Sequence, residues 1–214
     1  MRRLVQLLLS PPSRFARLVI AEKRLTCDLT APENPGEHLP VFVELDGSRH
    51  QGLWAIVDQL EGNYPDHPLT PEEPRQRAAS LRLLDWAMGP YLETVTRRIV
   101  YERASQRYTG STVQRAPDMQ IVRAGREALR AALAEIGAMA EQNGCLTSRD
   151  CTLGDLAVAA NLSAADYFGE VPWSEFPAAG EWYMRIKSRP SFRTLLADRV
   201  PGQPPAAHYP DLDA

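Results

Sequence analysis

Residues 4–23 of the chain read LVQLLLSPPSRFARLVIAEK, and they indicate a buried strand followed by a helix. The nearly continuous apolar run from Leu4 to Leu9 is typical of a strand that is covered on both faces. Ser10 and two prolines end this run, and the apolar residues of 13–23 then recur at helical spacing. A helix that begins at this turn offers free backbone N–H groups that can lower the pKa of a thiol or hydroxyl. The simpler interpretation is that a serine caps the helix and that Arg14 is solvated.

The remainder of the first 65 residues has the pattern of a small α/β unit. A second short strand is expected at 26–30, before a polar, proline-rich segment. Pro40 then opens an apolar strand at 41–45. The pair Asp46-Gly47 predicts a tight hairpin, which leads to a return strand at 50–53 and a helix at 53–60.

The second half of the chain is helical in pattern. Apolar residues at three- and four-residue steps predict two long amphipathic helices at 74–108 and 118–142. Thr152 and Asp155 have the spacing of a capping box, which is a structural feature at the start of a helix. The predicted order is an α/β domain at 1–65, a linker at 66–73, an all-helical domain at 74–199 and an extended tail at 200–214. Within the helical domain, shorter helices are expected at 153–168, 176–188 and 192–199.

Composition and charge exclude several classes of protein. With 44% hydrophobic and 24% charged residues among 214, the chain has enough apolar surface for a core. A formal net charge of −3 argues against nucleic acid as a partner, and no apolar stretch approaches the length that crosses a bilayer. Four scattered histidines and three cysteines without a CxxC pair suggest neither a metal site nor a disulfide framework, and we expect a cytoplasmic protein.

Several motifs together resemble the glutathione S-transferase superfamily across nearly the whole chain. They are the strand-to-helix turn at Ser10, the Leu39-Pro40-Val41 entry to the third strand, the capping box, and the helix end EWYMRIKSRPSF at 181–192. The resemblance implies a thioredoxin-like N-terminal domain, in which Pro40 is cis, followed by a C-terminal helical bundle. Without the resemblance, a trans proline in a turn fits equally well.

Within this superfamily, the chain most resembles the FtsZ-binding division factors of alphaproteobacteria. That resemblance rests on residues 9–11 (LSP), 21–25 (AEKRL), 121–126 (IVRAGR), 166–173 (DYFGEVPW) and 207–213 (AHYPDLD). It implies a non-enzymatic protein that binds FtsZ filaments at the division site and uses the old ligand cleft as a protein-binding surface. It also implies a homodimer, since transferase-like proteins usually close their long helices on a two-fold axis.

The glutathione site that the superfamily implies is incomplete here. The resemblance implies the pattern Glu-Ser-x-Ala-Ile after the fourth strand, as in transferases that bind glutathione. This chain has Gly52-Leu53-Trp54-Ala55-Ile56 at that place. Each lost group removes a charged hydrogen bond of about 1.5–3 kcal/mol. Residues 31–39 are also too few and too rich in proline to form the helix that transferases usually have between the second and third strands. No cofactor is therefore expected. The ligand cleft is predicted to comprise Ser10, Ser13, Arg14, Pro40, Gly52 and Leu53.

Two alternatives remain open from the sequence. The chain is also compatible with a glutathione transferase in which Ser10 activates the thiol, or with a helical adaptor of another kind. Arginines 97, 98, 103 and 107, with nearby tyrosines, form either a partner surface or an ordinary solvated face. The tail has the composition of a short binding motif, although a strand over its own domain would look the same. The predicted partner-binding residues are Trp54, Tyr91, Arg98, Tyr101, Tyr209 and Leu212.

Overall fold

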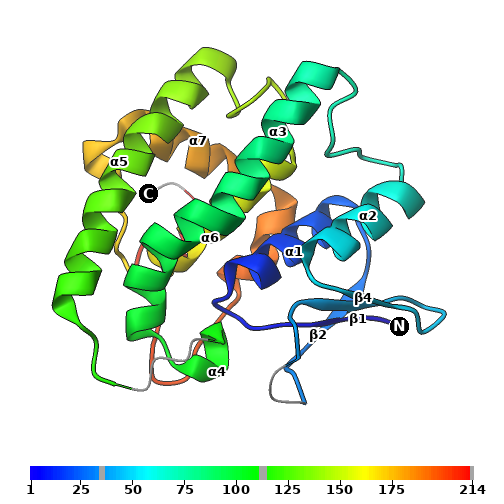
Figure 1. Cartoon of the computed structure of the whole chain (residues 1–214), viewed down its shortest axis with the longest axis horizontal. Coiled ribbons are helices and arrows are strands. Elements are labelled where there is room, and N and C mark those ends of the chain that lie inside the picture. The colour runs from blue at the N-terminus through cyan, green and yellow to red at the C-terminus, as the bar shows by residue number, and fades with distance from the viewer. Residues whose placement is uncertain (34–36, 111–114, 213–214) are drawn as a thin grey trace.

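A computed structural model of the chain describes residues 1–33, 37–110 and 115–212. Residues 34–36 of the predicted connection 31–39, and residues 213 and 214 of the predicted tail, lie outside the described residues. A small sheet with two helices forms one side of the molecule, and the long helices form the other (Figure 1).

The sheet has four strands in the order β2-β1-β3-β4. β1 (Arg2–Val5) pairs in parallel with β2 (Cys27–Thr30), while β3 (Val41–Val43) is antiparallel both to β1 and to β4 (Arg49–Gln51). Four strands follow one another along the chain as predicted, and β3 and β4 form the predicted hairpin, but the strands are shorter. β1 ends at Val5 rather than Leu9, because Ser10 donates its backbone N–H to the Leu7 carbonyl in a turn.

Two helices accompany the sheet. α1 (Pro11–Glu22) begins at the proline pair, whose missing N–H groups cost nothing in a first helical turn. α2 (Leu53–Asn63) begins at Leu53, so the predicted return strand at 50–53 stops at Gln51. α1 packs against α2 on one side and against the helical half of the chain on the other.

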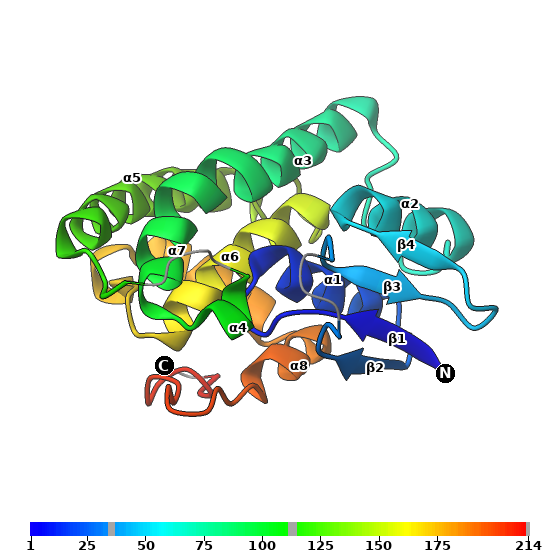
Figure 2. The same ribbon diagram turned by 60° about the horizontal axis from the view of Figure 1, so that its bottom comes forward.

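The predicted helix at 74–108 is divided into three segments. α3 (Pro74–Trp86) continues without a break into the π-helical η1 (Ala87–Tyr101), which contains Pro90, and a short α4 (Gln106–Thr109) follows. Pro90 has no N–H to donate, so a regular ladder cannot pass through it. Figure 2 shows α3 and α5 running along the same side of the helical half.

α5 and α6 match their predictions closely. α5 (Met119–Asn143) is capped by the Asp118 carboxylate and ends at Gly144, whose φ of +89° favours glycine. α6 (Leu153–Tyr167) is buried along its whole length, and it packs against α1, α3, η1 and α7. The capping box is confirmed, since the Asp155 carboxylate accepts from the Thr152 N–H at 3.0 Å.

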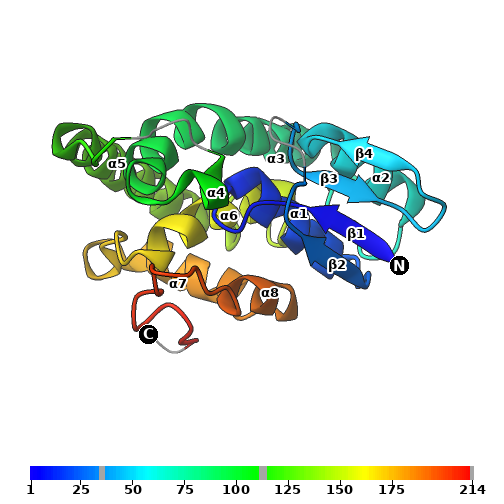
Figure 3. The same cartoon turned by 90° about the horizontal axis from the view of Figure 1, so that it is seen from below.

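The remaining segments wrap the far side of α6. They are η2 (Trp173–Glu175), α7 (Pro177–Lys187), η3 (Pro190–Phe192) and α8 (Arg193–Leu196). The tail does not extend away from the molecule. It turns at 200–203, where Val200 and Gln203 form a bridge, and lies along the helical half beside α7 and α8 (Figure 3). No helix among the described residues is both long and apolar enough to cross a membrane.

Candidate functional site

Ser10 lies at the start of α1, where the sheet half meets the helical half. Its side chain is buried and lies beside Tyr101, the last residue of η1. Burial raises the pKa of Tyr101, while the neighbouring Ser10 and Arg97 oppose that rise. Arg97 also lies over the Tyr101 ring, with its guanidinium carbon 5.3 Å from the ring centroid. The hydroxyl at the predicted catalytic position is thus enclosed by the protein's own side chains.

Pro40 and Gly52 face each other across the end of the sheet. The Leu39–Pro40 peptide bond is cis, as the resemblance implied, and the Gly52 N–H donates to the Pro40 carbonyl at 2.8 Å. Gly52 precedes α2 with a φ of +84°. A Cβ atom at this position would lie 3.0 Å from Nε2 of His38, so this imidazole occupies the space where a side chain would begin. Neither Gly52 nor Leu53 can supply the carboxylate or hydroxyl that the glutathione pattern requires.

Ser13 and Arg14 do not belong to an open cleft. The Ser13 hydroxyl accepts from the Leu7 N–H at 3.1 Å, and the residue is fully buried. The Arg14 side chain has no exposed surface. It donates to the Leu8 carbonyl, the Ser163 and Tyr209 hydroxyls and, at 2.9 Å, the Asp198 carboxylate. The prediction of a solvated or ligand-binding Arg14 is therefore wrong, because the side chain is fully buried and each of its three guanidinium nitrogens donates inside the protein.

The predicted partner-binding residues divide into two groups. Trp54, Arg98 and Leu212 are exposed, and the exposed fraction of Trp54 is 46%. Tyr91, Tyr101 and Tyr209 are buried, so they cannot serve as surface anchors in this structure. Burial raises the pKa of Tyr91, whose hydroxyl has no hydrogen-bond partner among the described residues. The helical spacing correctly placed Tyr91 and Tyr101 on one helix, but it could not distinguish the core face from a binding face.

Two of the sequence groups that carry the resemblance, 166–173 and the described part of 207–213, contact each other. The Asp166 carboxylate, which is fully buried, lies 2.9 Å from the His208 ring nitrogen and accepts from the Trp173 and Tyr183 side chains. The Tyr167 ring meets the Tyr209 ring edge to face at 5.2 Å. Sequence reasoning missed this pairing, because two segments 40 residues apart give no local signal that they touch. The tail is thus packed against its own domain down to Tyr209.

Neither the thiols nor the acidic and histidine side chains form a reactive or metal-binding group in the described part of the chain. Burial raises the pKa of Cys27 and of Cys145 to about 11, so both thiols are protonated near neutral pH. Within residues 1–33, 37–110 and 115–212, no group of three or more histidine, cysteine, aspartate or glutamate side chains could hold a metal ion.

Comparisons with known proteins give close relatives over the whole chain. FtsZ-localized protein A of Caulobacter vibrioides is 40% identical over 96% of this chain and 95% of its own length. A solved glutathione S-transferase from Rhodospirillum rubrum is 37% identical, with a TM-score of 0.93 over all of both chains. The structure of FzlA from C. crescentus is 38% identical, with a TM-score of 0.92 over 100% of this chain and 99% of the other. No protein-family model matches the chain.

Proposed function

Because the chain belongs to the family of FtsZ-localized protein A, within the glutathione S-transferase fold, we propose that it binds FtsZ filaments and acts in bacterial cell division without catalysing glutathione transfer. The name of the relative supports an association with FtsZ. The region that would bind glutathione supports the absence of catalysis, because the chain's own side chains occupy the space around Ser10 and Gly52. The predicted location is the division site in the cytoplasm.

The non-enzymatic part of the proposal rests on one observation: the polar side chains that would bind glutathione near Ser10 are absent. Ser10 is buried beside Tyr101, and His38 lies over the open side of Gly52. Leu53 adds an apolar side chain where the transferase pattern has a hydroxyl. A charged peptide such as glutathione would therefore lack hydrogen-bonding partners at Gly52 and Leu53. Leaving its charges unpaired at a buried site costs about 3 kcal/mol or more in total.

Trp54 supplies the best anchor for a protein partner near this site. It lies in the first turn of α2, two residues after Gly52, with 46% of its surface exposed. Tryptophan is enriched among the residues that contribute most to protein–protein binding, and a largely exposed tryptophan gains much by burial. We propose that the face around Trp54 contacts the FtsZ filament.

A dimer would strengthen such binding through avidity. We propose a homodimer formed through the long helices, in which two FtsZ-binding surfaces engage one filament or two. Light scattering on a sizing column should give about twice the 23.8 kDa chain mass at micromolar protein. A mass of one chain would contradict the dimer.

Co-sedimentation with FtsZ tests the proposed function directly. Wild-type protein should pellet with GTP-assembled FtsZ from its own organism and stay in the supernatant with GDP. Trp54→Ala should reduce the pelleted fraction, whereas Leu45→Ala should not, although Leu45 is an even more exposed apolar residue in the β3–β4 hairpin. If wild-type protein stays in the supernatant at every salt concentration, the proposed function is wrong.

A glutathione transferase is the second candidate, favoured by the retained Ser10 and cis-Pro40 and by the relative from Rhodospirillum rubrum. Under this alternative, Ser10 stabilises the glutathione thiolate at the start of α1. Retention on immobilised glutathione, with release by free glutathione, would favour the enzyme. Passage of the folded protein through the column without retention would favour the filament-binding function.

A further inference from the structure

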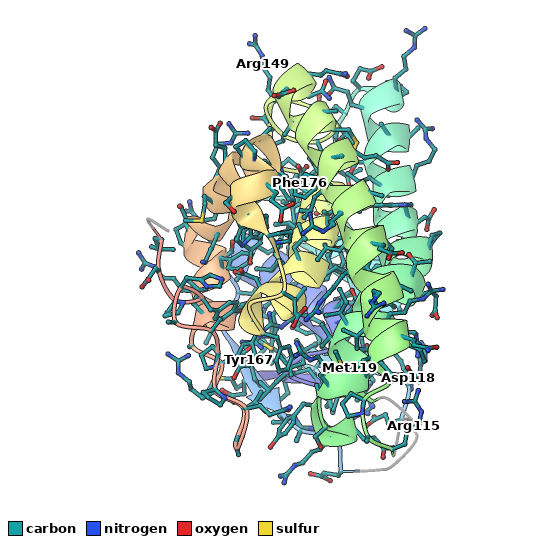
Figure 4. All side chains as sticks on the ribbon, turned by 90° about the vertical axis from the view of Figure 1, so that its left-hand side faces the viewer. Arg115, Asp118, Met119, Arg149, Tyr167 and Phe176 are labelled. Atoms are coloured by element: carbon teal, nitrogen blue, oxygen red, sulfur yellow. The ribbon has the colours of Figure 1, made fainter. Side chains whose placement is uncertain are left out.

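The charge of this chain is strongly segregated. Between residues 97 and 130 there are eight arginines and three acidic residues, which gives this stretch a formal charge of +5 and leaves −8 on the rest of a chain whose net charge is −3. The described residues of this stretch include the end of η1, α4 and the first half of α5, and η1 packs directly against α5. Figure 4 shows Arg115, Asp118 and Met119 together at the end of α5 where this stretch turns back.

Arginines from different elements converge around the buried carboxylate of Glu170. Arg126 donates to both of its oxygens at 2.7 and 3.1 Å, and Arg103, two residues beyond the end of η1, also pairs with it. Two guanidinium groups on one carboxylate leave a net positive charge at a site where both arginines remain partly exposed. Burial and the proximity of Arg126 both lower the pKa of Arg103, which is consistent with this excess of positive charge.

Two hollows open on either side of this cluster. The first, of about 480 Å³, is lined by Arg103 and Arg115 together with Ala104, Pro117 and Pro201. The second, of about 310 Å³, is lined by Arg126 and Arg130 together with Leu129 and Pro172. Arg103 lines the first hollow and Glu170 lines the second, so the ion pair between these two residues links the hollows.

α5 extends the positive surface beyond the second hollow. Arg123, Arg126 and Arg130 are spaced three and four residues apart, so they project from one side of the helix. All three are exposed. Arg126 pairs with Glu170 and Arg130 pairs with Glu175, whereas Arg123 has no ion-pair partner among the residues that the structure describes. We define the basic face as Arg103, Arg115, Arg123, Arg126 and Arg130.

We propose that the basic face binds an acidic, extended segment of a protein partner, with carboxylate side chains seated at the two hollows. The proposal concerns a surface apart from Trp54 and does not depend on FtsZ being the partner. Arg126 and Arg115 already bind carboxylates through two nitrogens each within this structure, so their geometry suits Asp and Glu. Concave hollows whose walls are more polar than apolar fit a charged peptide better than a flat membrane. The −8 on the rest of the chain also disfavours a long nucleic acid.

A labelled acidic peptide tests this proposal without FtsZ. The probe is fluorescein-(Glu-Gly-Asp-Leu)₃, with fluorescein-(Lys-Gly-Lys-Leu)₃ as the charge-reversed control, and binding is followed by fluorescence anisotropy. Wild-type protein should bind the acidic probe only, and affinity should fall about fivefold or more between about 50 and 500 mM NaCl, because salt screens exposed charges. Arg123→Glu and Arg126→Gln should each weaken binding by about threefold or more.

Arg149→Glu is the matched control. Arg149 is exposed and lies just beyond the opposite end of α5 from Arg115, as Figure 4 shows, so its reversal should leave affinity unchanged. Circular dichroism must confirm that each variant is folded. The proposal is overturned by failure of wild-type protein to bind the acidic probe, or by an equal loss in Arg149→Glu. Tighter binding to single-stranded DNA or to vesicles with anionic lipid would also overturn it, as would conversion of a dimer to a monomer by Arg123→Glu.

Discussion

His38 occupies the space in which a side chain at Gly52 would begin, with its Nε2 3.0 Å from the position of a Cβ atom. Gly52 also has a φ of +84°, a conformation that residues with a Cβ rarely adopt. The position that carries the glutathione-binding carboxylate in transferases is therefore closed to larger residues in two independent ways.

We expect Gly52→Ala to destabilise the protein more than Gly47→Ala. Both glycines have a similar positive φ, but nothing lies within 4 Å of a Cβ atom at Gly47. Gly47→Ala should cost about 1 kcal/mol of unfolding free energy for the backbone alone, and Gly52→Ala should cost about 1 kcal/mol more. Urea unfolding measures both values. Adding His38→Ala should recover part of the extra loss in Gly52→Ala; no recovery would show that His38 is not the obstruction.

We expect no appreciable glutathione conjugation by the wild-type protein. The Ser10 side chain is buried beside Tyr101, and Gly52 and Leu53 supply no partners for the γ-glutamyl group. Turnover of 1-chloro-2,4-dinitrobenzene should equal the buffer rate, and Gly52→Glu with Leu53→Ser should not restore activity. Turnover well above the buffer rate that disappears in Ser10→Ala would instead establish an enzyme.

Acid should weaken the contact between the two halves of the molecule at Glu22. This carboxylate at the end of α1 accepts from Arg189 at 2.6 and 2.7 Å and from Ser191. Burial opposes ionisation, but the bonds from Arg189 and Ser191 outweigh it and lower the pKa of Glu22. A lowered pKa in the folded state means that Glu22 contributes stability above the unfolded value of about 4.3, and this stability is lost as pH falls through the folded pKa.

Glu22→Gln measures this contribution. The variant should be less stable than wild type at pH 7 by about 1–2 kcal/mol, and the difference should shrink as pH falls below about 4. Glu181→Gln, a change at an exposed carboxylate on α7, should leave the pH profile of unfolding unchanged. A constant difference between Glu22→Gln and wild type at every pH would contradict the assignment.

The tail should contribute to stability through Tyr209 and not through Leu212. Tyr209 is fully buried, and its hydroxyl accepts from Arg14 at 3.1 Å, whereas Leu212 is 41% exposed. Tyr209→Ala should lower the unfolding free energy by about 3 kcal/mol. Leu212→Ala should change it by less than about 0.5 kcal/mol. Equal effects of the two substitutions in urea unfolding would mean that the tail is not docked as the structure has it.

Local sequence patterns predicted the elements of this fold well where a single local interaction decides the structure. The Asp118 cap, the Gly144 stop and the Thr152–Asp155 capping box are each determined by a few neighbouring residues, and all three are present. The long helices follow from apolar periodicity, which reports burial on one face. Pro90 lay within such a periodic stretch, and only the backbone conformation shows how the chain accommodates it.

By itself, the sequence determined the strand–helix start, the order of an α/β unit and a helical half, and the absence of a carboxylate and hydroxyl at Gly52 and Leu53. Only the tertiary structure decided that Arg14 is a buried link to Asp198 and that Tyr209 belongs to the core. The physical reason is that helical spacing specifies which residues share a face, but not what covers that face. Long-range contacts such as Asp166 with His208 decide whether a polar or aromatic residue becomes part of the interior or of the surface.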